Sequence, residues 1–410
     1  MPNDAAPPTS EVQPGPKGPA AQEGVVGTAS AFPDDIEDPP RFIQQLLLEL
    51  VESSGSDLFL VPGFPPAMKI DGTLRKARPK PLTPRLTLAL AKAIMNDRQM
   101  AEFERSNECN FGIAPSGIGR FRVSAFVQQE SVSLVLRIVP RTIPTIESMN
   151  LPGVFRELAM SKRGLIILAG ATGTGKSTSL AAMLDWRNEH SAGHIQTIED
   201  PIEFVHAHKN CVVTQREVGR DTEGWAVALR NSVRQAPDVV MIGEIRDRET
   251  MEHAVAFAET GHLVLTTLHA NNTNQALDRA IHLIPKDRRA QLLMDLSLNL
   301  RAIISQRLLA RQDGDGRVAA VEVMINSPLV AKHVFNGEIP EIREVMKRSR
   351  ELGMQTFDQA LFDLYEAGSI SFEDALRNAD SLNDLRLRIK LESKRVDSGQ
   401  AGHTHSLRLV

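Results

Sequence analysis

Gly170-Ala171-Thr172-Gly173-Thr174-Gly175-Lys176-Ser177 is the segment from which the architecture of this chain follows. It fits the pattern G-x-x-x-x-G-K-[ST], in which glycines let the backbone wrap around a polyphosphate at the start of a helix. An apolar run, Leu165–Ala169, precedes it, and a helical stretch, Ser177–Trp186, follows. This order predicts a loop that binds a polyphosphate through residues 170–178, Thr178 included, with Lys176 on the β- and γ-phosphates and the Ser177 hydroxyl on Mg²⁺.

Apolar runs alternate with helical stretches on both sides of this loop. The runs are Leu165–Ala169, Ile195–Ile198, Val239–Ile242 and Leu263–Thr267. Apolar strands separated by helices predict a parallel sheet covered on both faces, as in an α/β P-loop NTPase. From about residue 271 the pattern is mostly helical, with one hairpin expected between Leu308 and Ile325. We therefore place this domain, with its helical C-terminal part, at residues 151–382.

The preceding hundred residues show a different pattern. A helical repeat begins at Phe42, short alternating strands follow, and Asp71-Gly72 is a strong hairpin signal. A helix is expected over residues 84–103, before three more strands that end at Val139. Residues 41–140 therefore form an α+β domain, and residues 141–150 a short linker.

The two ends of the chain differ from these domains. Residues 1–40 hold nine of the 24 prolines and a single aromatic residue, Phe32, which predicts a disordered tail. Residues 383–410 are expected to form a basic, mobile tail. A solvated terminal element is the favoured interpretation of this tail, with partner docking or contact with anionic lipid as alternatives.

Composition excludes several classes of protein. The 410 residues suit two or three domains, and 47 basic against 51 acidic side chains give a net charge of −4, without the basic excess of a nucleic-acid binder. Two cysteines, Cys109 and Cys211, are too few for a disulfide scaffold or a four-cysteine zinc site. No apolar run approaches the ~18 residues of a membrane span, and no signal peptide is evident. We expect a reduced, cytoplasmic protein.

Polar clusters follow three of the predicted strands, where ligands bind in open α/β sheets. They are Glu199–Glu203, Gly243–Asp247 and Thr266–His269. A carboxylate beside a γ-phosphate can polarise water or help to hold Mg²⁺. Two acidic clusters beside a phosphate loop favour function over solvated charge, whereas His269 alone could equally be a structural histidine.

At these positions the sequence resembles the type II/IV secretion and pilus ATPases, over about residues 41–390. Gly170–Ser177 resembles the family's Walker A loop, Ile198–Phe204 its acidic "Asp box", Gly243–Asp247 its Walker B motif and Thr266–Asn271 its "His box". The resemblance implies a hexameric ring of subunits. Each subunit would have a PAS-like N-terminal domain and a RecA-like ATPase domain, with ATP bound between the two domains.

The same resemblance assigns roles to individual residues. It implies that Glu203 activates the attacking water, that Glu244 organises Mg²⁺ and that His269 senses the γ-phosphate. Arg122 and Arg137 of the N-terminal domain match best the arginines that complete the site. Gly243 stands where many P-loop proteins have an aspartate, a variant that the family shares, so Ser177, Glu244 and water would hold the metal.

Two absences favour the retraction branch of the family. The chain lacks the paired Cys-x-x-Cys motifs of the pilus-extension and secretion ATPases, and only a tail precedes residue 41. The helix needed for retraction in the PilT-like members lacks both its arginines here, where Ala331 and Phe335 stand, while residues 346–389 resemble the PilU-like members. The resemblance therefore implies an accessory retraction ATPase. It would work with a PilT-like ATPase and a PilC-like platform protein at the inner membrane, contacting the membrane through these partners.

Two other classes of function stay open from the sequence. One is a structural or regulatory ring subunit that binds ATP with little hydrolysis of its own. The other is a RecA-like motor on nucleic acid, which the net charge and the 4% aromatic content disfavour.

Overall fold

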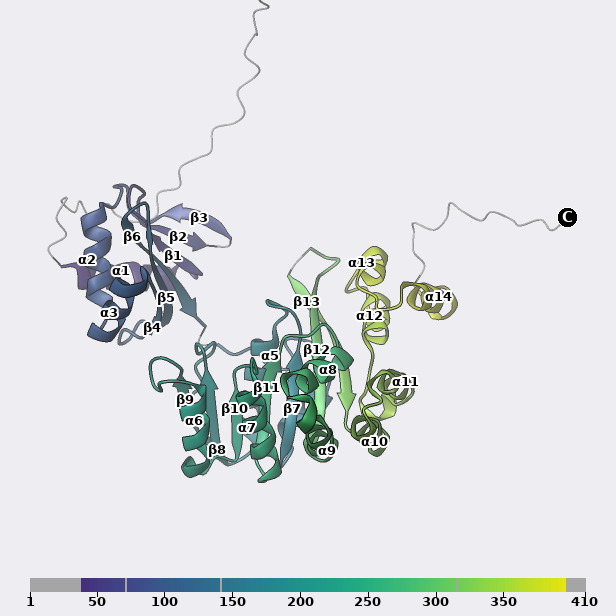
Figure 1. Ribbon diagram of the computed structural model, residues 1–410. Helices are drawn as coiled ribbons and strands as arrows, with labels where there is room; N and C mark the ends of the chain where they lie inside the picture. Colours follow the sequence, from purple (N-terminus) through teal and green to yellow (C-terminus); the bar gives the residue numbers. More distant parts are fainter. Residues whose placement is uncertain (1–37, 71, 141, 315, 396–410) are drawn as a thin grey trace, which may run out of the picture.

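The structure is a computed structural model that describes residues 38–70, 72–140, 142–314 and 316–395 (Figure 1). The predictions for residues 1–37 and 396–410, and for Asp71 in the expected hairpin turn, lie outside the described residues. No helix within these ranges has the length and apolar character needed to cross a bilayer.

The helices are α1 (Pro39–Glu52), α2 (Pro84–Ile94), α3 (Asp97–Ser106), α4 (Val154–Ala159), α5 (Lys176–His190), α6 (Trp225–Ser232), α7 (Arg248–Glu259), α8 (Thr273–Leu283), α9 (Arg289–Asn299), α10 (Pro328–Asn336), α11 (Ile342–Arg348), α12 (Phe357–Glu366), α13 (Phe372–Arg377) and α14 (Leu382–Glu392). The strands are β1 (Asp57–Leu60), β2 (Ala67–Ile70), β3 (Thr73–Lys76), β4 (Glu108–Ile113), β5 (Arg120–Gln128), β6 (Ser131–Val139), β7 (Gly164–Ala169), β8 (Gly193–Glu199), β9 (Cys211–Glu217), β10 (Val239–Ile242), β11 (Leu263–Leu268), β12 (Leu300–Ala310) and β13 (Arg317–Ile325).

The N-terminal domain is an antiparallel sheet in the order β3-β2-β1-β6-β5-β4, with α1, α2 and α3 packed beside it (Figure 1). Helix α1 buries one apolar stripe, which includes Phe42, Leu46 and Leu50, and these residues share a core with the sheet. The single helix expected over residues 84–103 is two helices. Helix α2 ends at Ile94 with Met95 as its C-cap, and Asn96 caps α3, because the side chains of Asn96 and Gln99 each accept the other's backbone N–H.

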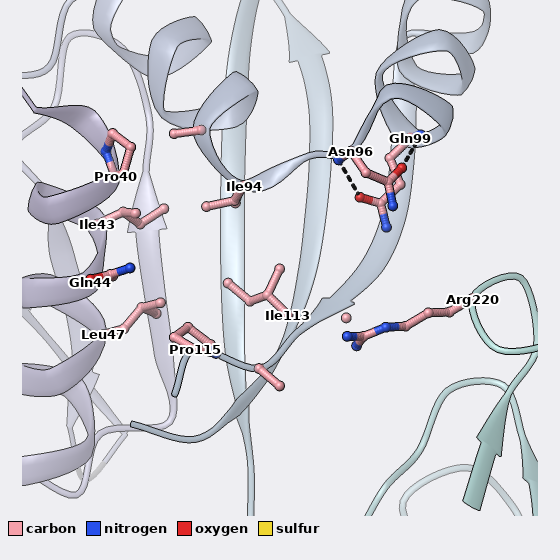
Figure 2. A pocket seen from close by; sticks show the side chains of 13 residues that line it. Pro40, Ile43, Gln44, Leu47, Ile94, Asn96, Gln99, Ile113, Pro115 and Arg220 are labelled. Atoms are coloured by element: carbon pink, nitrogen blue, oxygen red, sulfur yellow. Dashed lines mark hydrogen bonds between the residues drawn. The ribbon is translucent and has the colours of Figure 1, made fainter. Parts of the chain in front are cut away.

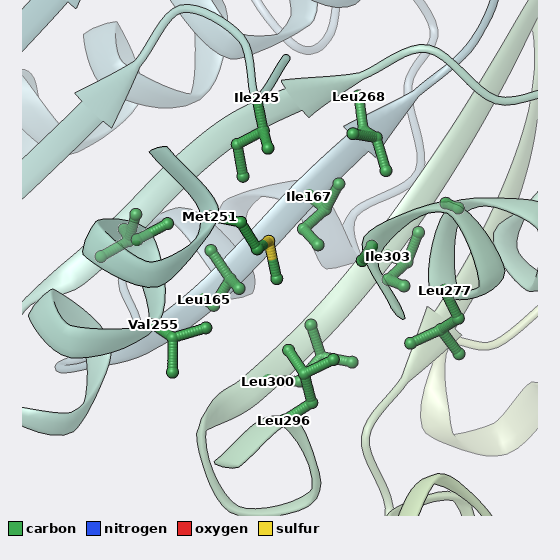
Figure 3. Packing of buried hydrophobic residues seen from close by; sticks show 14 of the residues in the cluster. Leu165, Ile167, Ile245, Met251, Val255, Leu268, Leu277, Leu296, Leu300 and Ile303 are labelled. Carbon is green, nitrogen blue, oxygen red and sulfur yellow. The ribbon is translucent and has the colours of Figure 1, made fainter. Parts of the chain in front are cut away.

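The second domain is built on a seven-stranded sheet in the order β13-β12-β7-β11-β10-β8-β9. All pairs are parallel except β12 with β13. Every residue of β7 is buried: Leu165 and Ile167 pack on one face among α7, α8 and α9, and Ile166 and Leu168 pack on the other among α4 and α5 (Figure 3). A central strand buried on both faces explains the continuous apolar run.

Two strands of this sheet differ from the expectation. Strand β9 was not predicted, and β12 begins at Leu300, inside a region expected to be helical. Strand β12 pairs with β7 and buries residues such as Ile303 and Ile304 on opposite faces. A short run of buried apolar residues has no period that separates strand from helix, so its sequence alone could not settle the choice.

The expected mobile tail from residue 383 is wrong for its first residues. They form α14, in which Leu385 and Ile389 are buried against α12 and the β12–β13 hairpin. Leu387 and Leu391 point outward, 57% and 76% exposed. The leucines alternate along the sequence, but the two buried residues lie four apart and therefore share one helix face.

Candidate functional site

The loops that follow four of the strands lie at one edge of the large sheet. Strands β7, β8, β10 and β11 run in the same direction, and Ile242 at the end of β10 pairs with Ile198 on one side and Thr266 on the other. The loops after these strands carry the phosphate-loop motif and the three polar clusters predicted from sequence. The carboxyl edge of a parallel sheet is where ligands bind in folds of this kind.

The phosphate loop adopts a backbone conformation that requires glycine. Gly170, Gly173 and Gly175 have φ angles of +154°, +80° and +87°. A Cβ atom on Gly170 would lie 2.8 Å from the backbone oxygen of Gln306, and one on Gly175 would lie 2.8 Å from the Gln306 side-chain nitrogen. The loop therefore lies directly against β12 and leaves its other side open.

Lys176 and its neighbours lie at the start of α5. The Lys176 side chain is 7% exposed and its ammonium donates to the carbonyl oxygens of Gly170 and Ala171, at 2.9 and 2.8 Å. Burial lowers the pKa of this ammonium from its ordinary value, an effect that the Glu244 carboxylate opposes. Ser177 is exposed and Thr178 half-buried on the first turn of α5, whose N–H groups have no helical partners.

Hydrogen bonds join the loops after β10 and β11. The Thr267 hydroxyl donates to the Gly243 carbonyl at 2.7 Å, and the Ile245 N–H donates to the Thr267 carbonyl at 2.9 Å. His269 Nε2 lies 3.2 Å from Glu244 Oε2, and Arg246 pairs with the other oxygen of Glu244. The structure thus brings together Glu244 and His269, two of the predicted site residues.

Glu203 lies in the loop after β8 and is half-exposed, with an ion pair to Arg122 of β5. Its backbone N–H donates to Glu199 Oε2 at 3.2 Å, while Glu199 Oε1 accepts from the Thr197 hydroxyl at 2.7 Å. Burial raises the pKa of the Glu199 carboxyl, and these hydrogen bonds oppose the rise. The structure therefore brings the predicted water-activating carboxylate into contact with one of the two predicted arginines.

Arg137 is the register partner of Arg122 across the β5–β6 pair. It lies on β6, paired in register with Asp57 of β1, and its Nε donates to Asp57 Oδ1 at 2.7 Å. This contact lies within the N-terminal sheet. Arg137 therefore lies next to Arg122 in the sheet, but its ion pair is with Asp57, whereas that of Arg122 is with Glu203.

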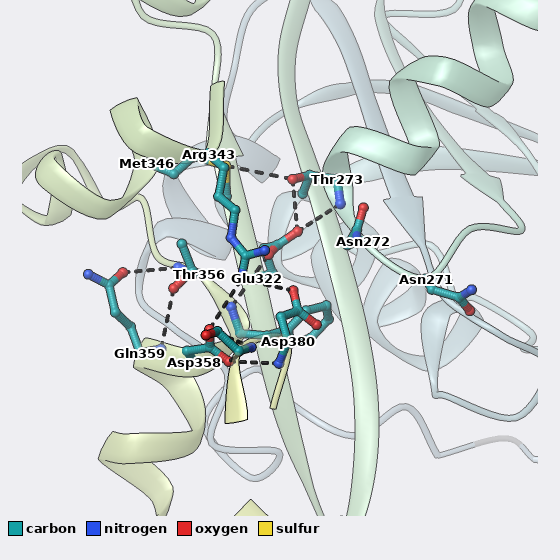
Figure 4. A network of polar contacts seen from close by, with 12 residues as sticks. Asn271, Asn272, Thr273, Glu322, Arg343, Met346, Thr356, Asp358, Gln359 and Asp380 are labelled. Atoms are coloured by element: carbon teal, nitrogen blue, oxygen red, sulfur yellow. Dashed lines mark hydrogen bonds and ion pairs between the residues drawn. The ribbon is translucent and has the colours of Figure 1, made fainter. Parts of the chain in front are cut away.

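A buried polar network fixes the segment that follows His269 (Figure 4). Glu322 of β13 accepts from the backbone N–H and the hydroxyl of Thr273, the first residue of α8, at 2.7 and 2.8 Å. Arg307 of β12 donates to the Asn271 carbonyl at 3.2 Å and pairs with Asp380 at 2.8 Å. These contacts connect the C-terminal helices to the edge of the sheet that carries the site.

The residues at this edge fit a magnesium nucleotide. The glycines let the loop lie against β12 with Ala171, Thr172 and Gly173 exposed, and Arg122 Nε is buried without a hydrogen-bond partner. The Ser177 hydroxyl and the Glu244 carboxylate offer the oxygen ligands that Mg²⁺ prefers. Within the described residues, no group of three or more His, Cys, Asp or Glu side chains forms a metal site of its own.

Comparison with known proteins agrees with this geometry. The model of the family described as "Type II/IV secretion system protein" matches residues 34–361. The chain belongs to this family. It is 56% identical over 364 residues to "Type IV pilus ATPase PilU" of Pseudomonas aeruginosa, covering 89% of this chain and 94% of that protein. It is 41% identical over 337 residues to "Type IV pilus retractation ATPase PilT" of the same organism, covering 82% of this chain and 98% of the relative.

A solved structure supports the family assignment. The crystal structure of the pilus retraction motor PilT with bound ADP is similar with a TM-score of 0.79 and 38% identity, over 84% of this chain and 99% of that one. The fold class predicted from sequence is thereby confirmed: a RecA-like NTPase domain after an α+β domain, with a helical C-terminal part.

The family motifs did not reveal several residues that support the site. Gln306 lies under the phosphate loop and accepts from the Ser179 hydroxyl at 2.8 Å, although 127 residues separate the two. Arg120 and Glu217 form an ion pair between the two domains. Each is an ordinary polar residue in a strand, so only the three-dimensional arrangement shows its role.

Proposed function

We propose that this member of the family is an ATP-hydrolysing motor that powers the retraction of type IV pili, as an accessory paralogue beside a PilT-like ATPase. One observation carries the proposal: the phosphate loop, Glu244 with His269, and Glu203 with Arg122 all lie at one edge of the sheet. The named relatives support it, since they are a pilus ATPase and a pilus retraction ATPase.

The chemistry follows from this arrangement. The N–H groups of the loop and the Lys176 ammonium stabilise negative charge that develops on the phosphates during hydrolysis. Glu203 accepts the proton of the attacking water, and His269 contacts the γ-phosphate beside Glu244. Mg²⁺, held by Ser177, Glu244 and water, would neutralise phosphate charge.

Glu203 must change its partner before it can act as a base. Its carboxylate is paired with Arg122, so the guanidinium occupies a carboxylate oxygen that would have to accept the proton of the water. The phosphates of ATP bind Arg122 more strongly than one carboxylate does, because arginine binds phosphate through two parallel hydrogen bonds. Nucleotide binding therefore releases Glu203 and recruits Arg122 in the same step.

The motor works as a homo-hexamer at the cytoplasmic face of the inner membrane. Domain movement in each subunit is passed to a PilC-like platform protein, which returns pilins to the bilayer. The membrane is reached through these partners, and nucleic acid has no part in the cycle.

Pilus retraction in living cells tests the proposal. Cells that lack this protein should retract labelled pili less often or with less force, and the wild-type gene should restore retraction. The Lys176→Ala variant should fail to restore it at equal protein level. Full restoration by Lys176→Ala would instead favour a structural ring subunit. Cells that contain this protein and no other retraction ATPase should retract little, if it is an accessory paralogue.

A further inference from the structure

We propose that Arg120 and Glu217 are positioning residues that hold the Glu203 loop in place only while the N-terminal domain is docked. The pair would make the chemistry of one domain depend on the position of the other. This inference rests on the role proposed above for Glu203.

The ion pair joins the two domains directly. Arg120 is the first residue of β5 in the N-terminal sheet, and Glu217 is the last residue of β9 in the large sheet. Arg120 Nη2 lies 2.5 Å from Glu217 Oε2, and the two side chains are 17% and 4% exposed. Water screens these two charges only weakly, so they attract each other strongly. Removing one of them would leave the other buried without a counter-charge.

The same oxygen of Glu217 also holds the site loop. Glu217 Oε2 accepts from the backbone N–H of Ile202 at 3.2 Å. The next N–H along the chain, that of Glu203, donates to Glu199 at 3.2 Å. Two buried carboxylates at the ends of β8 and β9 therefore fix two consecutive amides of the loop. Arg120 holds one of these carboxylates, that of Glu217, in place through its ion pair.

Strand β5 presents two arginines to this region. Arg120 and Arg122 lie two residues apart, so both project from the same side of the strand. Arg120 pairs with Glu217 and Arg122 with Glu203. A movement of β5 away from the large sheet would remove both contacts together.

Strand β4 packs closely on the same pair. A Cβ atom on Gly112 would lie 2.9 Å from Glu217 Oε1 and 3.0 Å from Arg220 Nη1. Arg220, three residues after Glu217, also lines a cavity of about 340 Å³ together with Ile113 and Pro115 at the end of β4 (Figure 2). A side chain at position 112 would therefore displace the Glu217 carboxylate or the Arg220 guanidinium.

Steady-state kinetics of the full-length protein test the inference. Arg120→Gln and Glu217→Gln should each lower kcat roughly tenfold or more, because a misplaced catalytic group is costly, while nucleotide affinity stays within about twofold. The double variant should be no worse than either single variant, since both changes remove one interaction. Arg78→Gln is the matched control: Arg78 pairs with Glu49 at 2.5 Å inside the N-terminal domain, and its loss should leave kcat unchanged.

Two further measurements distinguish a positioning role from a general loss of folding or stability. Hydrogen exchange in residues 200–204 should accelerate in Arg120→Gln and Glu217→Gln, but not in Arg78→Gln. Gly112→Val keeps both charges but displaces the Glu217 carboxylate, and should reproduce the loss of kcat with nucleotide still bound. These results would support the inference even if one of the charge variants folded poorly.

The inference and the proposed function fail in distinguishable ways. Wild-type kcat in both Arg120→Gln and Glu217→Gln, with Glu203→Ala inactive, would overturn the positioning role and leave the function intact. A parallel loss of nucleotide binding and kcat would also overturn it, because the pair would then be merely structural. Normal turnover in Glu203→Ala would instead contradict the proposed function.

Discussion

Gln306 shows how one residue can support a binding loop from beneath. It is 4% exposed, accepts from the buried Ser179 hydroxyl and contacts the loop at Gly170 and Gly175. Gln306→Ala would leave the hydroxyl without its acceptor and open space under the loop. We expect the free energy of unfolding to fall by about 1–3 kcal/mol and the KM for ATP to rise. Denaturant unfolding and ATPase kinetics would show this, and no change in either would disprove the supporting role.

The two predicted arginines can be separated by substitution. Arg122→Ala should lower ATP turnover, since Arg122 already contacts Glu203. We expect a smaller effect of Arg137→Ala on ATP turnover, because Arg137 is bonded to Asp57. A variant of either arginine with normal turnover and nucleotide affinity would remove that residue from the site.

At the scale of elements, His206 makes the segment between β8 and β9 sensitive to acid. Burial lowers the pKa of its imidazole to about 4, an effect opposed by Asp185 and reinforced by Lys209. The unfolded chain therefore binds a proton at a higher pH than the folded one. Stability that is complete above pH 6.5 is lost as the pH falls towards 4.

The loss can be measured against two variants. Between pH 7 and pH 5 His206 alone should remove about 2 kcal/mol from the free energy of unfolding. His206→Gln should lack this part of the pH dependence, whereas His282→Gln, at an exposed position on α8, should keep it. Equal pH dependence in the wild type and His206→Gln would contradict the account. Chemical denaturation at the two pH values gives the comparison.

Elements were predictable where local pattern and burial agree. Leu165–Ala169, with glycines after it, could only be a buried strand before a phosphate loop. Strand β9 is an edge strand with half-buried residues such as Thr214 and Gln215, so its pattern is weak. Strand β12 is apolar on both faces, so its sequence pattern is equally compatible with a helix. In α14, only the packing shows which leucines are buried.

At the scale of the whole molecule, the site depends on contacts between distant parts of the chain. The motifs predicted the residues at the carboxyl edge of the sheet, because each motif is local. They could not predict that Arg120 meets Glu217, 97 residues away, or that Arg137 is bonded to Asp57. The Arg120–Glu217 pair depends on how the domains dock, and the Arg137–Asp57 pair on how β1 and β6 align in the sheet. Neither arrangement has a local signal in the sequence.

Turnover of ATP by the purified protein is the most direct test of this account. We expect hydrolysis that depends on Mg²⁺ in the wild type, none in Lys176→Ala, and none in Glu203→Gln although the latter still binds a fluorescent ATP analogue. If the wild type hydrolysed ATP no faster than Lys176→Ala, or if Glu203→Gln kept the wild-type rate, the assignment of chemistry to this edge of the sheet would be wrong.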